Sequence, residues 1–178
     1  MRIFKDKKGF TLVELLAVIV VLAAVMLMAV NSVLPLIGEA RTGAFASSAN
    51  QTIDSVSTVI LTDELRGSNN VQCYSIRYLV ENGYLSKIES ANADKTAGYD
   101  GIVVVDKGSS TSSSSYKYSI YMVDYSSGYY YAGTGLAAGI IKGDEVQTYD
   151  VSKPLYSTCA SYAVANNLDW TQNTHYHD

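Results

Sequence analysis

Few residues of this 178-residue chain have the types and spacing that chemistry requires. The two histidines, His175 and His177, lie beside Asp178 in the last four residues, where we expect a frayed tail and no metal site. The acids between residues 144 and 150 match no EF-hand spacing. The sequence contains no G-x-S-x-G, P-loop or H-E-x-x-H motif. We therefore predict no catalytic residue, no metal, no cofactor, and a protein that is not an enzyme.

One ionisable residue stands out by its position. Glu14 lies at the start of an apolar run, and no residue from Leu15 to Gly38 carries a charge. As a helix these residues span roughly 36 Å, enough to cross a bilayer core of about 30 Å. An acid inside such a segment is by default functional, because leaving it unpaired in lipid is costly. The pattern predicts a membrane-spanning helix whose acid has a role.

The charges around this helix predict its orientation. Four basic residues and one acidic residue precede it, so the N-terminus is expected in the cytoplasm and the chain after about Gly38 outside. The formal net charge of −4 becomes more negative when that basic segment is removed. An acidic exterior is a poor match for phosphate backbones, so DNA is not expected as a direct ligand.

Three interpretations of the apolar run compete, and its length argues against the first. A cleaved secretory signal would have a shorter apolar core, of about 7 to 15 residues. A plain single-span anchor fits the length and leaves Glu14 as an acid at the membrane edge. The third rests on the sequence K-K-G-F-T-L-V-E-L-L from Lys7 to Leu16, which resembles the class III signal of type IV pilins and pseudopilins.

That resemblance implies a processing pathway and a set of partners. A prepilin peptidase would cut between Gly9 and Phe10 and methylate the new Phe10 amine. Glu14 would become the fifth mature residue and meet the amino terminus of a neighbouring subunit. The implied partners are copies of the chain in a helical filament, the peptidase, and an assembly machinery of platform protein and ATPases. The precursor would be a single-pass plasma-membrane protein, and the product an extracellular pilus.

The helix is expected to continue beyond the membrane. Residues 1–9 form the leader, residues 10–38 the transmembrane and filament-core helix, and residues 39–66 an amphipathic continuation. Pro35 can kink the helix, and the glycine-containing segment after Asp63 should end it. The apolar stripe of the continuation recurs at helical spacing: Phe45, Ala49, Ile53, Val56 and Ile60.

The rest of the chain predicts a small sheet. Residues 67–100 form a connecting region, with a short helix that Gly83 caps. Its Leu79–Leu85 segment, like Glu39–Phe45, resembles pilins of monoderm bacteria and suggests a Gram-positive origin. Residues 101–178 form the head, with a serine-rich exposed loop at residues 108–115. Period-two or β-branched patterns predict four strands: Ile102–Val105, Tyr116–Val123, Tyr129–Ala132 and Glu145–Val151. The expected fold is α+β, with the long helix packed against a small antiparallel sheet.

Two residue types in the head suggest further features. Cys73 and Cys159 are expected to form a disulfide in an extracellular setting, with two free buried thiols as the alternative. Fifteen tyrosines against three phenylalanines fit half-buried strands, where a ring packs and its hydroxyl stays wet. Tyr125 and the run Tyr129–Tyr131 cluster enough to suggest contact with glycans or host surfaces. Asn50-Gln51-Thr52 matches a glycosylation acceptor but falls inside the expected helix.

These observations favour a structural subunit of a type IV pilus-like surface filament, serving adhesion, aggregation, motility or DNA uptake. Two alternatives remain at this stage. One is a minor pilin or a pseudopilin of type II secretion or competence. The other is a membrane-anchored binding domain that does not polymerise.

Overall fold

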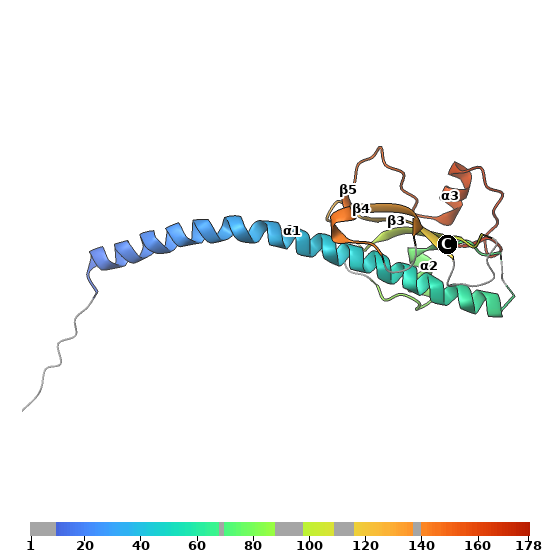
Figure 1. The fold of residues 1–178 in the computed structure, drawn as a ribbon, viewed down its shortest axis with the longest axis horizontal. Helices are drawn as coiled ribbons and strands as arrows, with labels where there is room; N and C mark the ends of the chain where they lie inside the picture. The colour runs from blue at the N-terminus through green and yellow to red at the C-terminus, as the bar shows by residue number, and fades with distance from the viewer. Residues whose placement is uncertain (1–9, 68–69, 88–97, 109–115, 137–139) are drawn as a thin grey trace, which may run out of the picture. The chain divides into compact units, whose positions relative to one another are not determined.

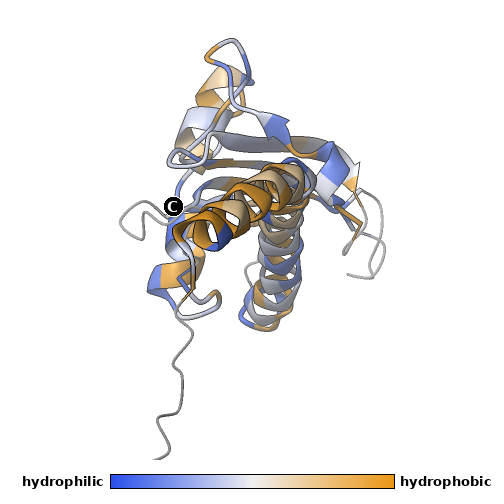
Figure 2. Cartoon of the chain, turned by 90° about the vertical axis from the view of Figure 1, so that its left-hand side faces the viewer, coloured by the Kyte–Doolittle hydropathy of each residue, from blue (hydrophilic) through white to orange (hydrophobic). Residues whose placement is uncertain are grey.

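A computed structural model describes residues 10–67, 70–87, 98–108, 116–136 and 140–178 (Figure 1). The chain divides into two compact units, Met1–Gly38 and Glu39–Asp178. Helix α1, Leu12–Leu65, belongs to both units and runs through Pro35 without interruption. In the first unit its side chains are exposed from Leu12 to Ile37. This apolar stretch is coloured orange in Figure 2.

In the second unit, α1 buries one face. The five residues of the predicted apolar stripe are all fully buried, and the helix ends at Leu65, within the predicted segment. Polar residues such as Asp54 lie on the exposed face. The hydrophobic core therefore forms between this face of α1 and the sheet, as the helical spacing predicted.

The connecting region begins with a strand that the sequence did not predict. Strand β1 is Cys73–Ser75, and the short helix α2 is Ile76–Glu81. The hydroxyl oxygen of Ser75 accepts a hydrogen bond from Tyr78 N (3.2 Å) and caps the helix start. Gly83 has φ +74° and Tyr84 N donates to Leu79 O (2.9 Å), which confirms the predicted glycine at the helix end.

The sheet has six strands in the order β5-β4-β3-β2-β1-β6. The remaining strands are β2 Asp100–Asp106, β3 Lys117–Asp124, β4 Tyr129–Leu136, β5 Gln147–Thr148 and β6 Tyr176–His177. The predicted α+β arrangement of a long helix on a small sheet is confirmed. Four of the five strand pairings are antiparallel as expected, and the sheet is mixed because β6 runs parallel to β1. The fourth predicted strand is shorter than expected, with two paired residues.

The two faces of the sheet pack against different parts of the chain. Tyr118, Ile120 and Met122 of β3 face α1, while Lys117 and Tyr121 lie on the other face, as the alternation predicted. The C-terminal segment, with helix α3 (Cys159–Ala165), covers that other face. Figure 1 shows the sheet between the C-terminal part of α1 and α3. The head therefore has an inner core against α1 and a smaller outer core beneath α3.

The side chain of Asn50 binds the backbone of Ile141 to α1 through two hydrogen bonds. Its Nδ2 donates to Ile141 O (2.8 Å), and Ile141 N donates to its Oδ1 (3.0 Å). Both polar atoms of the Asn50 amide are hydrogen-bonded, so Asn50 is a structural residue of α1 in the folded head. The next turn of the chain, the 3-10 helix η2 (Gly143–Glu145), then approaches α1 closely.

Two glycines at this approach differ sharply in their surroundings. A Cβ on Gly143 would lie 2.9 Å from the backbone N of Gly43 and 3.0 Å from its Cα, whereas a Cβ on Gly43 would meet nothing within 4 Å. We expect Gly143→Ala to lower the free energy of unfolding by about 1 to 3 kcal/mol, because helix backbone cannot move aside cheaply. Gly43→Ala is the matched control, and should be neutral or stabilise the helix by up to about 1 kcal/mol. Urea unfolding of both variants measures the difference, and equal effects would contradict the close packing.

Candidate processing and assembly site

The start of α1 is fixed by a reciprocal cap. Glu14 Oε2 accepts hydrogen bonds from Thr11 N and from Thr11 Oγ1, both at 2.8 Å, and Glu14 N donates to Thr11 Oγ1 at 3.3 Å. This is the arrangement of a capping box, in which the first residue and the third helical residue satisfy each other. It turns the Glu14 carboxylate toward the beginning of the helix, next to Phe10. Oε1 accepts no hydrogen bond from any described residue, so one oxygen remains available.

The side chains around Glu14 are apolar and exposed. Phe10 is 90%, Leu12 84% and Leu15 61% exposed. An apolar surface of this extent marks a membrane or protein contact. Among the described residues, α1 is the one helix long and apolar enough to cross a membrane. Of the predicted cleavage pair, Phe10 is described and exposed, and Gly9 lies outside the described residues.

The two cysteines are joined. Cys73 of β1 and Cys159 at the start of α3 form a disulfide that closes a sequence separation of 86 residues. Both residues are fully buried, and Ile102 packs beside them in the outer core. The predicted pairing is confirmed, and the alternative of two free thiols is excluded.

The C-terminal residues are ordered, so the prediction of a frayed tail is wrong. His177 lies in β6; its Nε2 is 3.3 Å from Asp63 Oδ2, an ion-pair distance, and its ring stacks on Tyr78 with centroids 4.5 Å apart. Asp63 also accepts a hydrogen bond from the Tyr74 hydroxyl at 2.8 Å. The Asp178 carboxylate accepts hydrogen bonds from the backbone N of the first two residues of α3. These contacts join residues far apart in sequence, which is why periodicity gave no sign of them.

His177 Nε2 lies against Asp63, although neither ring nitrogen of His177 has a hydrogen-bond partner among the described residues. The described part of the chain contains no group of three or more His, Cys, Asp or Glu residues that could hold a metal ion.

The tyrosines proposed as a surface patch do not form one. Tyr130 and Tyr131 are 2% and 7% exposed, and the Tyr129 ring packs edge-on against Phe45 in the inner core. Tyr125, at 55% exposed, is the exception. The run alternates between the two faces of β4, as consecutive residues of a strand must. Their role is packing, as the composition argument proposed for most tyrosines.

Buried tyrosine hydroxyls predict instability in alkali. Burial raises the pKa of Tyr130 to about 12, and burial beside Asp63 raises the pKa of Tyr74. The unfolded chain releases these protons near pH 10, so above about pH 10 the folded state holds protons that the unfolded state has lost. We expect the urea midpoint to be unaffected by these groups below about pH 10 and to fall as the pH approaches 12. Tyr130→Phe should reduce that slope, and an unchanged slope would contradict the assignment.

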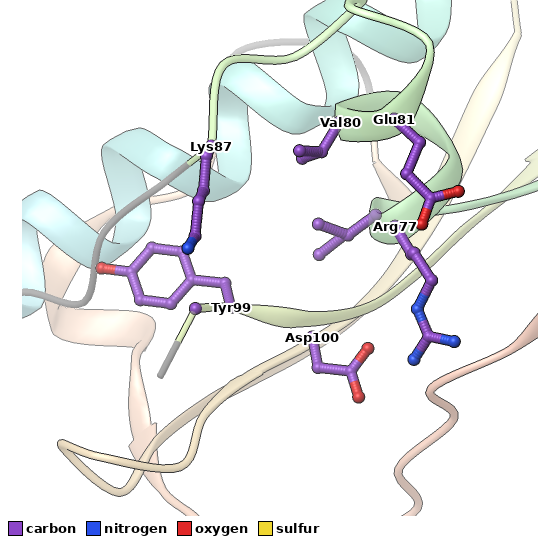
Figure 3. A pocket seen from close by; sticks show the side chains of 8 residues that line it. Arg77, Val80, Glu81, Lys87, Tyr99 and Asp100 are labelled. Carbon is purple, nitrogen blue, oxygen red and sulfur yellow. The ribbon is translucent and has the colours of Figure 1, made fainter. Parts of the chain in front are cut away.

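A hollow of about 270 Å³ lies beside α2 (Figure 3). Arg77 and Asp100 face each other across it, with Glu81 nearby, and Lys87 and Tyr99 also line it. Burial raises the pKa of the Asp100 carboxyl, while a hydrogen bond from Gly101 N (2.9 Å) and the charge of Arg77 oppose the shift. Among the described residues, those that line the hollow have opposed charges and include no histidine, serine or cysteine. They form no nucleophile and base pair, so the hollow gives no indication of catalysis.

A membrane-length apolar helix that carries a disulfide-bonded α+β head defines a membrane-anchored protein of pilin-like fold. Residues 4–30 match the family described as the prokaryotic N-terminal methylation motif, the class III signal of type IV pilins. This motif supports a type IV pilin or pseudopilin-like protein, and it points to a structural protein and not to an enzyme. No curated protein and no solved structure matches the chain.

Proposed function

We propose that the protein is the structural subunit of a type IV pilus-like surface filament. The observation that carries this proposal is the combination of the methylation motif at residues 4–30 with an exposed apolar helix bearing a capped acid at its start. Burial of this apolar surface against other copies is the driving force for assembly. The filament serves adhesion, aggregation, motility or DNA uptake, with the acidic head making DNA a poor direct ligand.

Processing prepares the assembly site. A prepilin peptidase cuts between Gly9 and Phe10 and methylates the Phe10 amine, which creates a positive charge at the tip of an apolar helix. The free Oε1 of Glu14 accepts a hydrogen bond from the Phe10 amine of a neighbouring subunit, while Oε2 keeps its hydrogen bonds from Thr11. A carboxylate and an ammonium that leave water are each costly unless paired. The pair therefore sets the stagger between subunits, since other staggers leave two unpaired charges.

The precursor and the product occupy different places. The precursor is a single-pass plasma-membrane protein with its N-terminus in the cytoplasm, because basic residues precede the span. Assembly, by a platform protein and ATPases that this chain does not supply, moves the subunit into an extracellular filament.

Mass spectrometry of the mature chain tests this proposal. The full chain is expressed with a prepilin peptidase, extracted from membranes and analysed intact. We expect loss of residues 1–9 and a methylated Phe10 at the new terminus. A chain that keeps Met1 in the presence of an active peptidase would overturn the proposal and favour a non-polymerising membrane anchor.

The methylation motif supports a pseudopilin or minor pilin equally well. Copy number separates these roles from that of a major subunit. Filaments sheared from cells should contain this chain as their main component if it is the major subunit, and as a trace component if it is a minor pilin.

A further inference from the structure

A group of aromatic side chains lies on the outer face of the sheet. Tyr156 and Tyr162 meet edge to face with centroids 5.0 Å apart, and Trp170 lies 5.9 Å from Tyr162 at an interplanar angle of 32°. Tyr121 of β3 contacts both tyrosines, at 5.0 and 5.8 Å. We call Tyr156, Tyr162 and Trp170 the C-terminal aromatic cluster. Its rings are half-buried on the outer core and are held by it.

The polar atoms of this cluster have no hydrogen-bond partner in the part of the chain that the structure describes. The hydroxyls of Tyr156 and Tyr162 and the indole Nε1 of Trp170 make no hydrogen bond to any described residue. None of these three atoms belongs to the set of buried unpaired side-chain atoms, so they reach solvent. A buried tyrosine or tryptophan usually satisfies its polar atom within the protein. Here three such atoms remain open to a ligand.

The rim of the cluster is polar and exposed. Asp169 and Gln172 flank Trp170, are exposed, and make no side-chain hydrogen bond within the described chain. The backbone that carries them is fixed, because Thr171 N donates to His175 Nδ1 at 3.2 Å and His175 N donates back to Thr171 O at 2.9 Å. The backbone next to Trp170 is therefore fixed, and Asp169 and Gln172 offer exposed polar groups beside it in the sequence.

This chemistry suits one class of ligand. A pyranose has an apolar C–H face that packs on an aromatic ring and a girdle of hydroxyls that need planar amide or carboxylate partners. The segment from Pro154 to Asp178 contains no lysine or arginine and two aspartates, so it repels polyanions. Protein hot spots instead favour fully desolvated aromatics paired with arginine.

We propose that the C-terminal aromatic cluster, with Asp169 and Gln172, binds uncharged oligosaccharides. This site belongs to the head, so it goes beyond the proposed filament role and does not depend on assembly. Glycan contact was expected at Tyr125 and the Tyr129–Tyr131 run, and the proposal moves it to the C-terminal segment.

The chain offers a direct readout, because Trp170 is its one tryptophan. The full-length protein in detergent micelles is titrated with chitohexaose, cellohexaose and maltohexaose while the Trp170 emission is recorded. We expect at least one of the three to change the emission in a saturable way. The proposal is overturned if none of them does so at millimolar concentration, or if choline or heparin saturates the signal in their place.

Variants locate the site by calorimetry with the sugar that binds. Trp170→Ala should weaken binding by about tenfold or more, the cost typical of a central aromatic contact. Trp170→Tyr keeps a ring and a polar tip, and should recover most of the affinity. The double variant Asp169→Ala, Gln172→Ala changes exposed side chains alone, so it tests the rim without endangering the fold, and it should also weaken binding. Unchanged affinity in this variant and in Trp170→Ala would overturn the proposal.

Two controls separate the site from other roles of the chain. Tyr125→Ala removes an exposed tyrosine that contacts Tyr149 and is not part of the cluster, and it should leave sugar affinity unchanged. Glu14→Ala should also bind sugar normally. Loss of filaments with intact sugar binding therefore reports on the proposed function, and loss of sugar binding with intact filaments reports on this site.

Discussion

Glu14→Ala is expected to reduce surface filaments by at least about tenfold, because each subunit would bury an unpaired Phe10 amine. Cleavage and methylation should continue, since the Gly9–Phe10 junction is unchanged. The measurement compares filaments in the sheared fraction and under the electron microscope with the amount of mature chain in the membrane. Wild-type filament levels in this variant would contradict the pairing of Glu14 with the amine.

Glu14→Gln separates the two roles that Glu14 can have. The glutamine side chain can still accept the hydrogen bond from Thr11 N, so it keeps the cap, but it has no charge to pair with an amine. If the charge matters, Glu14→Gln should lose filaments as Glu14→Ala does. If the cap alone matters, it should assemble normally and the pairing is wrong. Glu39→Ala, which removes an exposed acid of the same helix beyond the apolar run, is the matched control and should assemble.

The long helix and the inner core were predictable from the sequence because local periodicity determines them. The spacing of Phe45, Ile53 and Ile60 places them on one face of a helix, and all three are fully buried. Alternation from Tyr116 likewise predicted which residues of β3 face α1. Glu14 stood out because an acid is rare in an apolar helix, and the methylation motif matches the stretch that contains it.

The short strands and the C-terminal segment with α3 were not predictable in the same way. Strands β1 and β6 have three and two residues, too few for a period to be recognised. Strand β5 lies within the predicted strand Glu145–Val151 but has two paired residues. Strand β6 exists because it pairs with β1, about a hundred positions earlier in sequence, and because His177 lies against Asp63. Helix α3 is seven residues long and its first residue is the disulfide cysteine. The even pair of cysteines was the one sequence signal that this segment offered.

The disulfide between Cys73 and Cys159 is expected to have the largest effect on the stability of the head. Replacing both cysteines, as Cys73→Ala with Cys159→Ala, should lower the free energy of unfolding by about 4 to 5 kcal/mol, because the bond closes a long loop in the unfolded chain. Both residues are fully buried, so reductant should act slowly on the folded wild-type protein. Wild-type protein with the disulfide reduced is the control, because it lacks the bond but keeps the volume of both cysteine side chains. Its free energy of unfolding should agree with that of the double variant within about 1 kcal/mol.

The same variant should also lose cooperativity. Without the bond, α3 is held to the sheet by the Asp178 cap, the His177–Asp63 pair and the packing of the outer core. Such polar contacts contribute about 1 kcal/mol each, far less than the bond. The C-terminal segment should therefore open before the inner core does.

Two probes measured during urea unfolding test this order. In a two-state protein the transitions seen by Trp170 fluorescence and by far-ultraviolet circular dichroism coincide, and we expect this for the wild-type head. In the double variant the fluorescence transition should come first, and coincident transitions would mean that these remaining contacts hold the C-terminal segment without the bond.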